Sequence, residues 1–383
     1  MPLLIKGGLA LADTDNIIAA LGQSNRVSQV NLDLYGWQLE EILASMQVSF
    51  PELTDLQLYS HDETRSIIPD SFLGGSTPRL QLLTLGSIPV PGLPKLLLSA
   101  THLVNLNLYS IPHSGYFPPE AIVASLSVLS SLHKLYLGFQ SPQSRPDGGS
   151  RRRPPSKRSV LPALDEFRFK GVTEYFEELV ARIDTPQLSH ASTTFFNQID
   201  FDCPRLAQFM SCTPALMGLD EAHVQFDDRT ANVSLRHRTS ESVDDDLLIY
   251  ISCREPDWQL SSIEQICNSL PPLSLVEDLY IEPGLFFKSE LVWKNDAIEN
   301  TLWLELFLPF ITAKNLYLSK EFAPCIAAAL PELVGGRITE VLPSLQNIFV
   351  KGLESSGPFQ ENIERFIVSR QLSGHPIAIS VWD

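Results

Sequence analysis

The chain has 383 residues, and a hydrophobic fraction of 44% supports a sizeable core and argues against a disordered chain. Asp and Glu total 45 against 28 Lys and Arg, so the net charge of −17 repels the phosphates of nucleic acid and of anionic lipid. We interpret the negative charge mainly as a means of keeping the protein soluble, and an acidic docking surface is the alternative.

The N-terminal segment, residues 1–26, has the features of neither a signal peptide nor a membrane span. Its apolar patch follows no basic region, and Asp13 and Asp15 interrupt it early. An odd number of cysteines without a C-x-x-C pair indicates a reducing compartment. They are Cys203, Cys212, Cys253, Cys267 and Cys325. We therefore expect a cytoplasmic or nuclear location.

A short apolar pattern recurs along the chain. Its apolar residues stand at the first, fourth and sixth positions of the motif. The motif starts at Val27, Leu53, Leu80, Leu103, Leu132, Leu164, Val276, Ala313 and Leu345, with weaker copies at Leu188 and Leu216. Internal repetition of this kind predicts a repeat architecture in which each motif is one strand.

The motif L-x-x-L-x-L resembles the leucine-rich repeat. The segments after several motifs carry apolar residues at helical spacing, as in 39–46, 176–183 and 263–270. We expect a single α/β leucine-rich-repeat solenoid over residues 1–383, a horseshoe with parallel strands on its concave face and helices on its convex face. The usual Asn after the strand is missing, so no asparagine ladder is expected there.

Residues 141–159 interrupt the repeats with a stretch rich in Pro, Gly, Ser and Arg. It lacks apolar periodicity, which predicts a disordered surface loop. Its basic core, residues 151–158, matches a nuclear localisation signal, and a solvated insertion is the alternative.

Residues 222–253 form the second interruption. Alternating apolar residues between short polar turns predict a β-meander, a short antiparallel insert in the sheet. The letters Asp-Glu-Ala-His at 220–223 match a helicase motif, but the sequence has no Gly-Lys pair for a phosphate-binding loop, so we interpret them as part of a strand. Asp244, Asp245 and Asp246 lack the spacing of a calcium loop and suit a solvated turn.

The C-terminal third continues the repeats. Ser261 and Glu264 have the spacing of a capping box, which predicts that a helix starts there. The segment at 374–383 contains Gly-His and Trp-Asp pairs typical of propeller blades, but each occurs once, which favours a closing strand.

Catalytic and metal-binding signatures are missing from the sequence. The eight histidines follow no zinc spacing, no G-x-S-x-G elbow occurs, and no Cys has a recognisable protease context. We expect no enzyme activity, no metal and no cofactor.

The face of the strands turned away from the helices is the candidate binding surface. Side chains alternate along a strand, so the fifth position of each motif, and the position one residue beyond the motif, point to that face. Fifth positions hold Asn31, Gln57, Thr84, Asn107, Tyr136, Arg168, Tyr280, Tyr317 and Phe349, and Tyr59 and Tyr109 follow two of the motifs. Large rigid rings are favoured at protein interfaces, so we expect partner binding through Tyr59, Tyr109, Tyr136, Arg168, Tyr280, Tyr317 and Phe349, unless neighbouring groups cover these rings.

Several longer segments resemble fungal F-box-type leucine-rich-repeat proteins. They include DWQLSSIEQICNSLPPLS from Asp257, the stretch from Trp303 to Leu353, and RQLSGHPIAISVWD from Arg370. The resemblance covers most of residues 20–383. It implies a substrate receptor of a ubiquitin ligase, in which an F-box binds a Skp1-like adaptor and cullin while the repeats hold the substrate.

The adaptor-binding half is not seen. Only 26 residues precede the first repeat, and they lack an F-box pattern. Residues 117–126 match an F-box opening in a few letters but carry the spacing of a repeat helix. The expected function is therefore a protein-binding repeat module, with a stand-alone scaffold, a truncated gene product and an enzyme built on 222–253 as alternatives.

Overall fold

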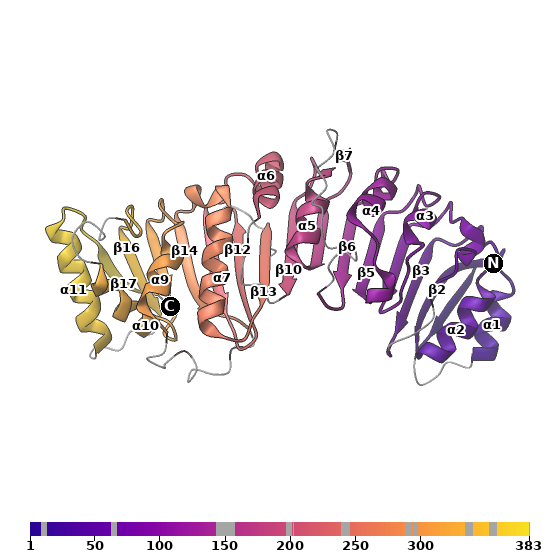
Figure 1. The fold of residues 1–383 in the computed structure, drawn as a ribbon, viewed down its shortest axis with the longest axis horizontal. Helices are drawn as coiled ribbons and strands as arrows, with labels where there is room; N and C mark the ends of the chain where they lie inside the picture. The colour runs from indigo at the N-terminus through magenta and orange to yellow at the C-terminus, as the bar shows by residue number, and fades with distance from the viewer. Residues whose placement is uncertain are drawn as a thin grey trace. The chain divides into compact units, whose positions relative to one another are not determined.

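The computed structural model describes residues 1–8, 14–62, 67–142, 158–196, 201, 203–238, 246–285, 287, 293, 298–333, 340–351 and 358–382. The chain divides into two compact units, Met1–Ser189 (unit 1) and His190–Asp383 (unit 2), shown in Figure 1. Each unit is a mixed α/β structure built on an open, mainly parallel sheet.

The strands of unit 1 follow one another in chain order and are all parallel. They are β1 (Leu3–Gly7), β2 (Val27–Leu34), β3 (Asp55–Ser60), β4 (Leu82–Gly86), β5 (Asn105–Ile111), β6 (Lys134–Phe139) and β8 (Glu166–Gly171). Two short strands, β7 (Ser159–Val160) and β9 (Ile183–Asp184), pair separately. Every strong motif of this half of the sequence is a strand.

Helices return the chain between these strands on one face of the sheet. They are α1 (Thr14–Leu21), α2 (Gly36–Ser45), α3 (Leu93–Leu97), α4 (Pro119–Leu126) and α5 (Thr173–Val180). The apolar spacing predicted two of them, and it placed residues 117–126 correctly as a repeat helix. Proline stands in the first turn of α3 and α4, where its missing N–H costs no helical hydrogen bond.

The strands of unit 2 depart from chain order. Their order across the sheet is β10 (His190–Phe196), β13 (Leu247–Ser252), β12 (Thr230–Arg236), β11 (Glu221–Phe226), β14 (Asp278–Pro283), β15 (Asn315–Leu318), β16 (Asn347–Lys351) and β17 (Ala378–Trp382). Strand β12 is antiparallel to both β11 and β13, and the other pairs are parallel. Residues 222–253 thus contribute three strands that lie within the sheet.

The helices of unit 2 are α6 (Pro204–Cys212), α7 (Pro256–Ser269), α9 (Asn300–Phe307), α10 (Ala323–Ala329) and α11 (Pro358–Leu372). Figure 1 shows α7 in front of the strands, and α7 contacts β12 and β13 of the sheet and the helix α9. The capping-box prediction was wrong: α7 starts at Pro256, so Ser261 lies inside the helix. The earlier start places proline in the first turn, which is a stronger start signal than the Ser261–Glu264 spacing.

Burial alternates along the strands, which explains the motif. The motif leucines face the helices, and Leu56, Leu106, Leu279 and Leu316 are completely buried. Fully burying such a side chain stabilises the fold by about 1.5–3 kcal/mol. The intervening side chains lie on the opposite face of the sheet, which we call the open face.

Three sequence predictions fail or fall outside the described residues. Leu216 lies in a 3-10 turn and its strand begins only at Glu221, so the motif copy at Leu216 is not a strand. Residues 143–157, most of the basic stretch, and residues 244 and 245 lie outside the described part, and Ser159 belongs to β7. Asp246 accepts a hydrogen bond from the backbone N–H of His237, 3.0 Å away.

Candidate partner-binding face

The strand register brings the fifth motif positions of unit 1 into one row across the open face. Each pairs directly with the next, in the order Asn31, Gln57, Thr84, Asn107, Tyr136 and Arg168. Thr84 does not meet the prediction that this row faces solvent, because it is only 2% exposed. It is the shortest side chain of the row, and Asn107 donates a hydrogen bond to its hydroxyl at 3.3 Å.

Tyr59 and Tyr109 lie beside this row and gather with Tyr136, which belongs to it. The rings of Tyr59 and Tyr109 stack with centroids 6.5 Å apart, and Tyr109 and Tyr136 are 4.5 Å apart. Tyr59 and Tyr109 both pair with Gly86, on the strand between them. A Cβ at Gly86 would lie 2.5 Å from the ring of Tyr59, so this glycine provides the space in which the rings meet.

A small charged group lies beside Tyr136. The guanidinium of Arg168 and the ammonium of Lys134 both contact the carboxylate of Glu166, at 2.5 and 2.6 Å. Burial acts to raise the pKa of Glu166, but the two cations outweigh it and the pKa is lowered. Arg168 remains exposed, so it can still contact a partner.

Unit 2 carries a longer aromatic column on its open face. Ring centroids are 4.2 Å apart for His223 and Tyr280, 4.1 Å for Tyr280 and Tyr317, and 4.6 Å for Tyr317 and Phe349. Interplanar angles are 4°, 7° and 10°. The four residues occupy one register row, on β11, β14, β15 and β16. We call them the aromatic column.

Trp382 on β17 packs against the column edge-on. Its ring centroid is 5.7 Å from that of Tyr280 and 5.5 Å from that of Tyr317, at steep interplanar angles. The ammonium of Lys351 lies 5.1 Å from the centroid of the Trp382 ring. Trp382 therefore shields part of the column and carries a cation–π contact of its own.

His223 is held at the end of the column between two carboxylates. Its Nε2 is 2.6 Å from Glu221 and its Nδ1 is 3.1 Å from Glu282. A neutral imidazole has only one N–H, so donation to both carboxylates requires the imidazolium. Burial acts to lower the pKa of His223, but these two hydrogen bonds raise it overall. Arg236 also contacts Glu221.

A polar ladder runs along the neighbouring row. Asn315 donates to the carboxylate of Asp278 at 2.5 Å, and Asn347 donates to the side-chain oxygen of Asn315 at 2.8 Å. Arg238 contacts the same Asp278 at 3.2 Å. This ladder stands at the starts of the strands, whereas the sequence prediction concerned an asparagine after the strand. It ties β14, β15 and β16 together beside the column.

The hydroxyl of Tyr280, in the middle of the column, is uncharged. Burial, followed by the nearby charge of Glu221, raises the pKa of Tyr280, so its hydroxyl stays protonated. Face-to-face stacking uses the ring faces within the column and turns ring edges and hydroxyls outward. Because neighbours fix the rings, a partner would bind them with little loss of side-chain entropy.

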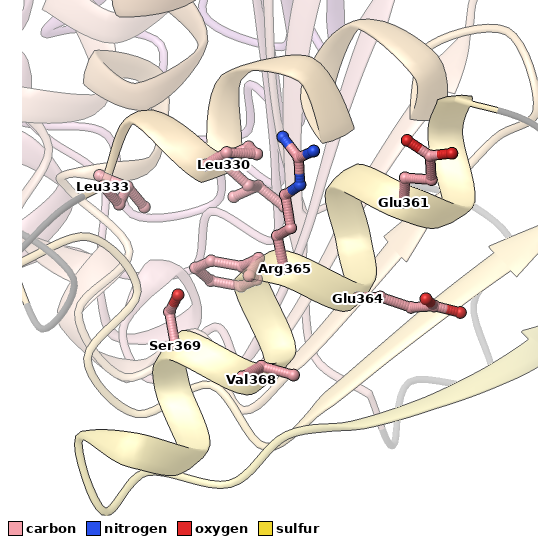
Figure 2. Close-up of a pocket in the computed structure, with 9 residues that line it drawn as sticks. Leu330, Leu333, Glu361, Glu364, Arg365, Val368 and Ser369 are labelled. Atoms are coloured by element: carbon pink, nitrogen blue, oxygen red, sulfur yellow. The ribbon is translucent and has the colours of Figure 1, made fainter.

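Figure 2 shows a hollow beside α11 on the helical side of unit 2. Its volume is about 670 Å³. It is lined by Leu330, Pro331, Leu333, Glu361, Glu364, Arg365, Phe366, Val368 and Ser369. Arg365 extends alongside Leu330 while Glu364 points away from it. This mixture of charged and apolar groups suits a solvated groove better than a small-molecule site, in which a few polar groups converge in an apolar pocket.

Within the described ranges, no group of three or more His, Cys, Asp or Glu side chains could hold a metal ion. The five cysteines are free thiols, of which Cys212 is exposed. No helix in the described part of the chain is long and apolar enough to cross a membrane.

Comparison with known proteins assigns no family. No family model matches the chain, and no curated protein matches it. A solved structure that it resembles is the leucine-rich-repeat-containing protein LegL7 from Legionella pneumophila, at 13% identity over 95% of this chain and 97% of that one. The TM-score is 0.34, too low for this similarity to support an argument about fold or function.

Sequence reasoning identified three members of the column and missed His223 and Trp382. It aligned the repeat at Leu216, five residues before the strand starts, so His223 was not placed in the row. Alternation within Glu221–Phe226 contained the missing signal, since Ala222, Val224 and Phe226 are buried and His223 lies between them.

Proposed function

We propose that this chain is a protein-binding repeat module whose partner binds the open face of unit 2. The observation that carries the proposal is the aromatic column of His223, Tyr280, Tyr317 and Phe349, four rings stacked at 4.1–4.6 Å. Interface hot spots are enriched in rigid aromatic side chains, which bury a large area at small entropic cost.

The tyrosines of unit 1 form a second proposed contact region. Tyr109 is 39% exposed, Tyr59 and Tyr136 lie beside it, and Arg168 is the register partner of Tyr136. Arginine next to tyrosine is a common combination at interfaces, because the guanidinium both stacks and donates hydrogen bonds.

A substrate-receptor role in a ubiquitin ligase is the finer form of the proposal. It rests on the resemblance to F-box-type repeat proteins and on no feature of the fold. A free-standing scaffold is the alternative, and recovery of a Skp1-like adaptor and cullin with the tagged chain distinguishes the two.

The test is affinity purification of the tagged chain from its native cells, compared with a Tyr280→Ala, Tyr317→Ala, Phe349→Ala variant. The matched control is Trp37→Ala, Trp258→Ala, which removes rings that are 60% and 45% exposed on helices α2 and α7. We expect the column variant alone to lose the partner proteins, with unfolding followed by circular dichroism for all three chains.

Equal recovery of partners by the column variant and the parent would refute binding at the column. Adaptor and cullin among the recovered proteins would support the ligase form. Partners recovered without them would support the scaffold.

A further inference from the structure

On strand β17, the apolar side chains that face the helical side of the sheet are not covered. Ile379 and Val381 are 39% and 59% exposed. Their register partners on β16, Ile348 and Val350, are 0% and 2% exposed. In the described residues β17 pairs with β16 alone. The apolar side chains of β16 are therefore buried, whereas those of β17 are exposed to solvent.

The backbone of β17 is also available for pairing. The N–H of Ala378 donates to Gln346 on the β16 side at 2.8 Å. Backbone groups alternate between the two edges of a strand, so those of Ile379 and Val381 point to the free edge. The edge of β17 away from β16 therefore presents backbone N–H and C=O groups that can pair with another strand.

The residues of β17 give no protection against strand addition. Residues 378–382 read AISVW, without a charge, a proline or a glycine. Proteins usually guard free edges with charged residues, prolines or bulges. By contrast, β1 in unit 1 carries Lys6 and buries Ile5 to 6% exposure.

We propose that β17 pairs with β17 of a second copy of this chain, antiparallel and about a two-fold axis at Ser380. This register places Ile379 opposite Val381 of the second copy, with both residues exchanging their free backbone hydrogen bonds. On the open face it places the large Trp382 opposite the small Ala378. The strand is thus complementary to itself in both backbone and side chains.

The dimer should be weak and sensitive to salt. One five-residue strand per copy is short for an interface, and interfaces at the small end of the range are transient, so we expect a dissociation constant of roughly 10–100 µM. Each copy carries a net charge of −17, so added salt should strengthen association by screening this repulsion.

The first test is sedimentation of the full chain over a range of concentrations, for the parent, Val381→Pro and Val381→Thr. Proline removes an N–H on the free edge and leaves the bonds to β16 intact, whereas threonine keeps that N–H and the branched side chain. We expect Val381→Pro to raise the dissociation constant of the dimer by about tenfold or more, and Val381→Thr to leave it close to the parental value. The circular dichroism of both variants should be unchanged.

The second test fixes the register. Ser380→Cys in a Cys212→Ser background should form a disulfide between copies under mild oxidation, since directly opposite residues of a non-hydrogen-bonded pair lie about 4.5 Å apart at Cα. The Cys212→Ser chain alone is the control.

A chain that remains monomeric at about 200 µM, above the expected dissociation constant, would overturn the proposal. So would a dimer that neither weakens in Val381→Pro nor cross-links through Ser380→Cys, because its interface would then lie elsewhere. Neither result bears on the aromatic column, whose binding is tested separately.

Discussion

Tyr280 on β14 and Tyr317 on β15 stack face to face, with centroids 4.1 Å apart and ring planes 7° apart. The two residues are direct register partners on parallel strands. Neighbouring strands lie about 4.8 Å apart, which is close to the optimum for stacked rings. Aromatic residues at the same position of successive repeats therefore stack because of the strand register and spacing alone. His223 and Phe349 extend the column in both directions.

Gly86→Ala should destabilise unit 1 by about 1–3 kcal/mol, the usual cost of overpacking. The added Cβ would lie 2.5 Å from Cδ1 of Tyr59, so the ring must leave its stack with Tyr109. The free energy of unfolding in urea measures the effect.

The control for this substitution is the same change in a Tyr59→Ala background. Without the ring the clash is gone, and alanine orders at lower entropic cost than glycine, so Gly86→Ala should then be neutral or stabilising. An equal loss of stability in both backgrounds would show that Tyr59 is not the group displaced.

The imidazolium of His223 should make stability fall as pH rises above about 6.5. The folded-state pKa of His223 is raised above its usual 6.5, so this contribution is full below about 6.5 and is lost as pH rises through the folded pKa. The pKa values of Glu221 and Glu282 are lowered, so their contributions are present above about 4.5 and lost as pH falls through the folded values.

Melting temperature against pH for the parent and His223→Gln measures this effect. Glutamine retains one donor and one acceptor but cannot carry charge. The difference between the two chains should be largest near pH 6 and shrink toward higher pH. A difference that stays constant above pH 6.5 would mean that the charge on His223 does not contribute.

Asn315→Leu should cost about 1–3 kcal/mol, because it removes one hydrogen-bond partner from the buried carboxylate of Asp278 and one from the side chain of Asn347. Asn315 is the middle of the ladder, donating to Asp278 and accepting from Asn347, and the side chain of Asp278 is only 2% exposed. Asn347→Leu, at the outer end, should cost less. Chemical denaturation of both variants ranks them, and the reverse order would contradict this account of the ladder.

Much of the fold followed from the apolar period, and the reason is physical. Each strong motif buries its first, fourth and sixth positions against a helix, so the pattern marks strand position and facing together. The register then aligned residues of equal motif position, which is why the motif alone was enough to place Tyr280, Tyr317 and Phe349 in one row.

The failures occurred where the period does not control the outcome. Strands β11 to β13 follow the pairing rules of a meander, so counting from Leu216 misplaced the strand that carries His223. The contact of Trp382 with Tyr280 depends on how a side chain crosses the sheet, which no spacing encodes. Thr84 is buried because longer neighbours cover it, which depends on side-chain size as well as facing.

Arg370→Met should destabilise unit 2 by about 1.5–3 kcal/mol, the range for hydrogen bonds made by a charged group. Arg370 is completely buried, and its guanidinium donates to the carbonyls of Leu342, Pro343 and Leu345 at 3.3–3.5 Å. Burial lowers the pKa of Arg370, yet arginine keeps its charge at neutral pH, so the three carbonyls are held by a cation. Methionine matches the aliphatic part of the side chain but cannot donate.

Arg365→Met, on the exposed side of the same helix, is the matched control and should change stability by less than about 0.5 kcal/mol. Urea unfolding of both variants decides the matter, because equal effects would show that the buried guanidinium does not anchor residues 342–345.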